Sequence, residues 1–249
     1  MRRHVLVDGL LLVVLLAASG CGRLPGKPAP GAEVPRPDSI LDPVALYRAN
    51  CAGCHGTDGK HGPAMALSDP VYLSIVDNAT LRSTIALGRS GMAMSAFSQK
   101  EGGMLTDEQI DSIVRGIRER WGASPLVGAT PPPYKATATG NARQGEAVYT
   151  TFCASCHGSN GQGGPKAGSV TDPAYLSLIS DQGLRTLVIT GRPDFGAPDW
   201  RDNVPGRPMT DQEISDVVAW LSSQRPAVSG ELDAANSPAE AGHHVGGGH

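Results

Sequence analysis

The chain contains the sequence Cys51-Ala52-Gly53-Cys54-His55 and repeats its pattern as Cys153-Ala154-Ser155-Cys156-His157. Two thiols at this spacing, followed by a histidine, are typical of covalent haem attachment, in which the cysteines bind the porphyrin and the histidine binds the iron. Zinc sites or redox dithiols are the alternative reading. A zinc site needs four ligands, whereas each copy offers two cysteines and one nearby histidine. The repeated motif therefore predicts two covalently bound haems.

The composition agrees with an interior built around a cofactor. Aromatic residues make up 4% of the 249 residues, whereas there are 32 glycines and 20 prolines. This is a small supply of core-forming side chains for domains of about 80 residues. An apolar haem would complete such a core, and we expect the chain without haem to be poorly folded. The formal net charge of −3 argues against nucleic acid as a partner.

The N-terminus has the pattern of an export signal that ends in a lipidation site. Two arginines precede an apolar run over 10–18, and small residues lead to Cys21. We expect 1–20 to be a lipoprotein signal peptide, Cys21 to carry the lipid, and the proline-rich stretch 21–40 to be a tether. An uncleaved anchor or an ordinary secretion signal is the alternative. Each of these readings places the haems outside the cytoplasm, facing the periplasm or the cell exterior.

The remainder of the chain is an internal duplication. Besides the cysteine motifs, three blocks recur in the same order: Asp69–Ser74 and Asp172–Ser177, Gly88-Arg89 and Gly191-Arg192, and Thr106–Ile110 and Thr210–Ile214. The repeat predicts domains at 41–121 and 140–226, joined by a proline-rich linker at 122–139. The polar, glycine-rich stretch 227–249 is predicted to be a disordered tail.

Within each unit the sequence indicates short helices. Pro43 suits the first turn of a helix that runs into Cys51, and Asn141 suits the start of the matching helix. Thr106 and Thr210 suit the N-caps of two helices with one apolar face each. No alternating strand pattern is visible, so the predicted fold class is all-α.

These features resemble the class I cytochrome c fold, twice over, between 41 and 225. The resemblance rests on a haem motif near the end of a first helix, a glycine-rich loop after it, and a methionine-bearing loop before a last helix. It implies two tandem cytochrome c domains, each a few short helices around a covalent haem c. It also implies that the first and last helices cross at a small residue. Gly145 and Trp220 match this pair in the second unit, and Pro43 and Gly116 stand at the corresponding positions in the first.

The resemblance also implies further groups at each haem. Pro63 and Pro165 match a proline whose carbonyl accepts the other ring proton of the proximal histidine, with a simple turn role as the alternative. Met94 aligns with the methionine that binds iron on the side opposite His55. Met92 is the alternative ligand, and a core role is open for both methionines.

The second unit departs from this pattern, because Ala197 stands where Met94 stands in the first. Met209 is the one methionine in the sequence of this unit. It is predicted to bind the iron of the second haem, opposite His157. Met209 also aligns with Leu105, an apolar position, which favours a core role. Without Met209, the second iron would be five-coordinate or bound by Lys166, water or a tail histidine.

The predicted function is electron transfer between respiratory-chain partners by a membrane-anchored di-haem cytochrome, with redox proteins or a membrane complex as partners and no small-molecule substrate. Two alternatives are open. The first is a di-haem peroxidase-like or oxidase enzyme with an open second haem, which Ala197 favours. Against it, the sequence shows no distal histidine or acid–base pair for peroxide cleavage. The second is a fixed electron-exit subunit of a membrane quinol-oxidising complex.

Overall fold

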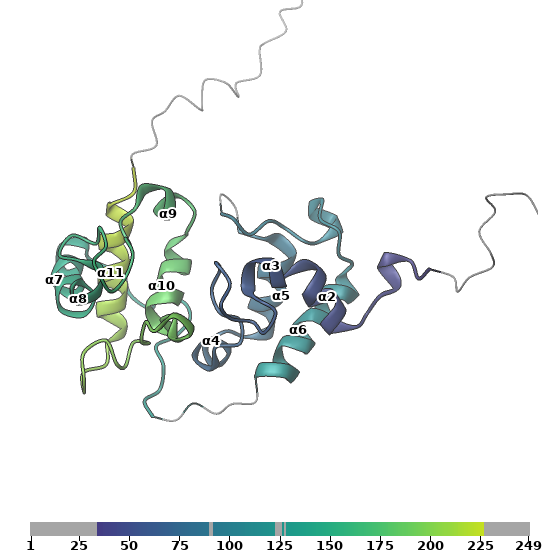
Figure 1. Cartoon of the computed structure of the whole chain (residues 1–249), viewed down its shortest axis with the longest axis horizontal. Helices are drawn as coiled ribbons and strands as arrows, with labels where there is room; N and C mark the ends of the chain where they lie inside the picture. The colour runs from purple at the N-terminus through teal and green to yellow at the C-terminus, as the bar shows by residue number, and fades with distance from the viewer. Residues whose placement is uncertain (1–33, 90–91, 123–125, 127, 227–249) are drawn as a thin grey trace, which may run out of the picture. The chain divides into compact units, whose positions relative to one another are not determined.

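The computed structural model describes residues 34–89, 92–122, 126 and 128–226. The predicted signal peptide, Cys21, most of the tether and the tail lie outside the described residues. The described chain consists of helices and loops, with two isolated β-bridges and no strand, which confirms the all-α prediction (Figure 1). A short 3₁₀ helix, η2 (Pro37–Ser39), precedes a compact unit that begins at Ile40 and includes both repeats.

The first repeat begins with the helix that the sequence predicts. Pro43 occupies its first position, and the Asp42 side chain accepts a hydrogen bond from the Val44 N–H at 2.9 Å. The last helix of the repeat begins after Thr106, which forms a reciprocal capping box with Gln109. Both predicted starts are confirmed. In chain order the elements are α2 (Pro43–Asn50), α3 (Ala52–His55), α4 (Pro70–Ile75), α5 (Asn78–Leu87), the 3₁₀ helix η3 (Gln99–Glu101) and α6 (Asp107–Trp121).

The second repeat has the same order of α-helices, but its 3₁₀ helix lies before Ala197, whereas that of the first repeat follows Met94. Asn141 caps its first helix through hydrogen bonds to two backbone N–H groups, and Thr210 forms a capping box with Glu213 at its last helix. These two predicted starts are also confirmed. The elements are α7 (Ala142–Phe152), α8 (Ala154–His157), α9 (Pro173–Ser177), α10 (Asp181–Thr190), the 3₁₀ helix η4 (Pro193–Phe195) and α11 (Asp211–Ser223). They are coloured green to yellow in Figure 1.

In each repeat the first and last helices cross at a glycine. A Cβ atom at Gly145 of α7 would lie 2.0 Å from the Asp216 carbonyl oxygen and 2.8 Å from Cβ of Trp220. The predicted Gly145–Trp220 contact is therefore confirmed. In the first repeat the glycine is on the other helix, because a Cβ at Gly116 of α6 would lie 2.5 Å from Cβ of Pro43. A side chain on either glycine would force the two helices apart.

The stretch between the repeats is held by side chains of both. Tyr134 packs against the core of the first repeat, and its hydroxyl accepts a hydrogen bond from Arg89 Nη2 at 2.6 Å. Arg185 of α10, 2% exposed, donates to the carbonyls of Pro133 and Tyr134 at 2.9 and 3.1 Å. This part of the predicted linker is therefore bound to residues of both repeats.

Candidate functional site

Each cysteine motif lies at the point where the first helix of its repeat ends and a four-residue helix begins. The Cys51 N–H donates to the Tyr47 carbonyl at 2.8 Å, and the Cys153 N–H donates to the Tyr149 carbonyl at 2.8 Å. The four motif cysteines are free thiols. The short helices α3 and α8 bring the two thiols and the histidine of each motif together on one turn.

The first cysteine of each motif is partly withdrawn from solvent. Burial raises the pKa of Cys51 to about 11 and the pKa of Cys153 to about 12. These two thiols are therefore protonated at neutral pH when no group is bound to them.

Both motif histidines are fixed by a backbone carbonyl. His55 Nδ1 lies 2.8 Å from the Met65 carbonyl oxygen, and His157 Nδ1 lies 2.7 Å from the Gly168 carbonyl oxygen. A carbonyl only accepts, so Nδ1 carries the proton and the Nε2 lone pair is available to a metal. Burial also lowers the pKa of His55, which keeps its imidazole neutral. This is the donor that a haem iron requires on its proximal side.

The prediction that Pro63 and Pro165 provide these carbonyls is wrong. The Ala64 N–H donates to the Cys54 carbonyl at 2.9 Å, which holds Pro63 against the short helix and leaves the Met65 carbonyl to reach the histidine. Pro165 lies inside a turn that the hydrogen bond from the Gly164 N–H to the Ala167 carbonyl closes at 2.9 Å. Sequence reasoning missed Met65 and Gly168 because a backbone carbonyl leaves no signature in the residue type.

A tyrosine in each repeat ties the first helix to the loop after the motif. The Tyr47 hydroxyl donates to the Gly56 carbonyl at 2.9 Å, and the Tyr149 hydroxyl donates to the Gly158 carbonyl at 2.6 Å. Two thiols, a fixed imidazole and a braced loop thus occur twice with the same geometry. This donor set fits a covalently bound haem in each repeat.

The loops that carry Met94 and Ala197 share a backbone hydrogen bond but differ in side chain. The Arg89 N–H donates to the Met94 carbonyl at 2.8 Å, and the Arg192 N–H donates to the Ala197 carbonyl at 3.0 Å. Ala197 therefore holds the place of Met94 in the fold as well as in the sequence. Met94 is half-buried against the core of the first repeat, and Met92, also half-buried, precedes it in the same loop.

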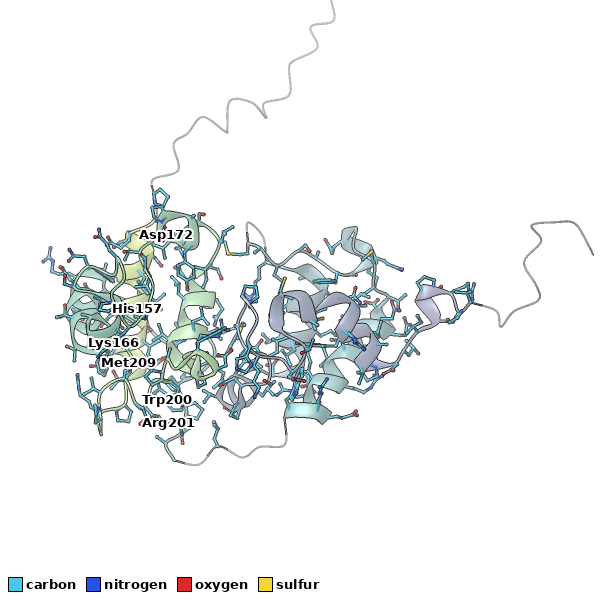
Figure 2. The ribbon with its side chains drawn as sticks, viewed as in Figure 1. His157, Lys166, Asp172, Trp200, Arg201 and Met209 are labelled. Atoms are coloured by element: carbon cyan, nitrogen blue, oxygen red, sulfur yellow. The ribbon has the colours of Figure 1, made fainter. Side chains whose placement is uncertain are left out.

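Met209 takes the place of Leu105. The Leu105 N–H donates to the Phe97 carbonyl at 2.8 Å, the Met209 N–H donates to the Trp200 carbonyl at 2.9 Å, and the two side chains are 4% and 3% exposed. Met209, Trp200 and His157 are labelled in Figure 2. Ligation of the second iron by Met209 stays a prediction, and a position that leucine fills in the first repeat does not favour it. Lys166, the other internal alternative, is exposed.

Comparisons with known proteins match both repeats. The family model "Cytochrome c" matches residues 142–225, and the model "Cytochrome C oxidase, cbb3-type, subunit III" matches residues 38–115. The cbb3-type cytochrome c oxidase subunit FixP of Azorhizobium caulinodans is 33% identical over 165 residues, which cover 58% of this chain and 51% of FixP. The cytochrome bc1 complex cytochrome c subunit of Mycobacterium leprae is 28% identical over 196 residues, covering 74% of this chain and 64% of that protein. The chain thus spans between half and two thirds of the length of these relatives.

The fold and the two sites define an all-α protein that binds haem covalently in each of two repeated domains. With a cytochrome c family match over each repeat, the chain belongs to the c-type cytochromes and holds two haem c groups. In the part of the chain that the structure describes, no helix is long and apolar enough to cross a membrane.

Proposed function

We propose that this protein carries single electrons between respiratory-chain partners as a di-haem cytochrome. When bound, the haem iron supplies the one-electron ferric–ferrous couple. Relatives of the chain are named as subunits of a cbb3-type oxidase and of a cytochrome bc1 complex. The observation that carries the proposal is a buried or half-buried imidazole, fixed by a backbone carbonyl beside two free thiols, twice within one compact unit.

The residues of the chain would hold the histidine ligand of each iron in one orientation. The hydrogen bond from His55 to the Met65 carbonyl fixes the ring orientation and raises the basicity of Nε2. Apolar helices cover the site, because the core of the first domain includes Leu46, Tyr47 and Ile113, and Met94 packs against it. A rigid, water-poor environment changes little between the two oxidation states, so little reorganisation accompanies electron transfer. We propose Met94 as the distal ligand of this iron, with Met92 as the alternative.

We further propose that the protein is exported and attached to a membrane through a lipid on Cys21, with 21–40 as the tether and with cytochrome c domains at 41–121 and 140–226. The sequence pattern around Cys21 and the membrane complexes named for the relatives support this location. Cys21→Ala should release a soluble cytochrome. Mass spectrometry of the N-terminal peptide should find a diacylglyceryl cysteine in the unaltered protein, and an unmodified Cys21 would contradict the anchor.

The electron-transfer proposal is tested on the full chain, matured in a host with haem-ligation machinery. A haem assay against protein concentration should give two haems per chain. Electrochemical titration should give two reversible one-electron steps, and a quinol-oxidising membrane fraction should reduce the protein. One haem per chain or none, or redox steps that are not reversible, would contradict the proposal.

A fixed subunit of a quinol-oxidising complex is the second candidate, because several relatives bear that description. Solubilisation of native membranes in mild detergent separates the two possibilities. A free carrier would elute alone, whereas a fixed subunit would co-purify in constant ratio with cytochrome b.

A further inference from the structure

The loop of the second domain that stands in place of the methionine-bearing loop contacts the first domain. Arg192 Nη2 donates to the Gly62 carbonyl at 2.8 Å, and Asp194 Oδ2 accepts from the His61 N–H at 2.8 Å. The two side chains also pair with each other, since Arg192 Nε and Nη2 each lie 3.0 Å from a carboxylate oxygen of Asp194. We refer to Arg192 and Asp194 as the charged clamp.

The charged clamp is largely withdrawn from solvent. The side chain of Asp194 is 4% exposed and that of Arg192 is 19% exposed. Hydrogen bonds from Arg192 lower the pKa of Asp194 to about 2, so the carboxylate is charged at neutral pH. The pair is therefore a fixed positive and a fixed negative charge whose side chains are covered by their neighbours close to the surface of the molecule.

The receiving loop has a conformation that needs support. His61 has φ 63°, and among the described residues it is the one non-glycine residue with a positive φ. This left-handed conformation costs about 1 kcal/mol or more for a side chain of this size. The Asp194 carboxylate binds the backbone N–H of this residue, and the His61 ring meets the Phe195 ring edge-on at 6.0 Å. The second domain thus stabilises the loop that follows the first haem motif.

An apolar contact accompanies the charged one. Val71 of α4 is 2% exposed because it packs into the core of the second domain with Ile189 and Trp200. Ala174, its counterpart in the second repeat, is exposed. The two domains therefore have one defined interface, which uses different residues from each copy of the repeat.

The charged clamp is close to the first haem motif. A Cβ on Gly62, the residue whose carbonyl binds Arg192, would lie 2.2 Å from the Cys54 carbonyl oxygen. Arg89, the counterpart of Arg192, binds the Tyr134 hydroxyl of the linker instead. Only the second copy of this arginine thus contacts the loop that follows a haem motif.

We propose that Arg192 and Asp194 are positioning residues for the first haem: they lock the second domain onto the loop 61–64 and set the reduction potential of the first haem with two opposed charges. A cation near the iron stabilises the ferrous state and raises the potential, and an anion does the reverse. Removal of either charge leaves the other unpaired and partly buried. The two removals should therefore shift the potential of the first haem in opposite directions, which a loss of packing alone would not do. The use of this potential in electron transfer rests on the function proposed above.

The test uses the loaded full chain with Arg192→Gln, Asp194→Asn and both changes together. Spectroelectrochemical titration should show a lower potential of the first haem in Arg192→Gln, a higher one in Asp194→Asn, and a value near the unaltered one in the double variant. The reduction potential of the second haem should change less than that of the first in each variant. The first haem is identified by the near-infrared band of its thioether ligand. The matched control is Arg82→Gln, which removes one arginine of the first domain that pairs with two aspartates at its surface, and which should move neither potential.

Hydrogen exchange gives a second measurement. The amide hydrogens of His61, Gly62 and Ala64 should exchange faster in both single variants and at the unaltered rate in Arg82→Gln. Arg192→Lys keeps the charge but loses the fork geometry, so it should retain the potential better than Arg192→Gln. Potentials that are unchanged, or that move in the same direction in both single variants, would overturn the inference. Failure of the electron-transfer proposal would appear differently, as a lack of reversible steps in the unaltered protein.

Discussion

Met94 and Ala197 occupy the same backbone position in two domains that otherwise repeat each other closely. One closing hydrogen bond is common to the two loops, from the N–H of Arg89 or Arg192 to the carbonyl of Met94 or Ala197, and the chain before each loop turns at the matching glycines Gly88 and Gly191. The second loop has a further hydrogen bond from the Ala197 N–H to the Arg192 carbonyl, so the side chain is one of two differences at this point. A thioether stabilises ferrous iron and raises the potential, whereas a methyl group offers no donor. Two haems in similar folds are thus expected to differ in potential.

Replacement of Met94 tests the distal ligand of the first haem. Met94→Ala should abolish the near-infrared band from the thioether to ferric iron and lower the potential of this haem, because the sulfur donor is lost. Near-infrared absorption and redox titration measure both effects. Met92→Ala is the control in the same loop and should leave the band intact. If Met92→Ala removes the band and Met94→Ala does not, the ligand is Met92.

Met209→Leu tests the second haem at the level of one side chain. Leucine fills the matching place in the first domain, so the variant should fold, lose less than about 1.5 kcal/mol of unfolding free energy, and keep the near-infrared band at full intensity. The band is compared with the haem content of the same sample. If Met209→Leu instead loses part of the band, and Met94→Ala retains that part, Met209 is the ligand of the second iron.

At the level of helices, two corresponding arginines of the repeats make different contacts. Arg82 of α5 pairs with Asp107 and Asp111 of α6, with its side chain 39% exposed. Arg185 of α10 is 2% exposed, pairs with Asp211 of α11 and donates to linker carbonyls. The linker covers the second arginine, so this ion pair has a buried arginine and a partly exposed aspartate.

This difference predicts unequal costs for the same substitution. Arg185→Met should destabilise the protein by about 1–3 kcal/mol, because it removes the buried donor of the linker carbonyls and the ion pair with Asp211. Arg82→Met, the matched control, should cost about 1 kcal/mol or less, as for an exposed pair. Chemical denaturation of the loaded protein measures both. Equal losses would mean that the linker does not bury Arg185 in solution.

The helix crossing in the second domain predicts a large effect from one carbon atom. Gly145→Ala would gain up to about 1 kcal/mol in helix propensity, but its Cβ would lie 2.0 Å from the Asp216 carbonyl oxygen. Overpacking costs about 1–3 kcal/mol, and backbone atoms on both sides cannot yield, so we expect a net loss of stability and a lower melting temperature. Gly53→Ser is the control, since a Cβ there meets nothing within 4 Å and serine is the residue of the second motif. A melting temperature of Gly145→Ala at or above that of the unaltered protein would contradict this crossing.

For the whole molecule, the haem of one domain should support the other domain. The interface places Val71 of the first domain in the core of the second, so collapse of the second core exposes part of the first. A chain with both Cys153→Ser and Cys156→Ser should carry one haem, lose helix content, and show a lower melting temperature for the haem that remains. Circular dichroism measures the loss of helix, and absorbance at the haem band measures the melting of the domain that keeps its haem. An unchanged melting temperature of the remaining haem would show that the domains are stable independently.

The parts of the fold that depend on near neighbours in the chain were predictable. Helix starts at Pro43 and Asn141 and capping boxes at Thr106 and Thr210 are confirmed, since a cap needs only residues within one turn. The Gly145–Trp220 contact is also confirmed. The family resemblance predicted this contact, and no local rule would have done so. The carbonyls that fix the histidines were predicted wrongly at Pro63 and Pro165, because the path of an irregular loop depends on what packs around it.

The sequence by itself determined that two haems are attached, where the attachment motifs lie, and that the surrounding elements are short helices. These follow from bond formation and hydrogen bonding between residues a few positions apart. Only the tertiary structure decided that Met209 fills the place of a core leucine, that Met65 and Gly168 orient the histidines, and that Arg192 and Asp194 bind the loop of the other domain. Those contacts join residues that are far apart in the chain. They depend on how the whole molecule packs, and no local sequence pattern encodes that packing.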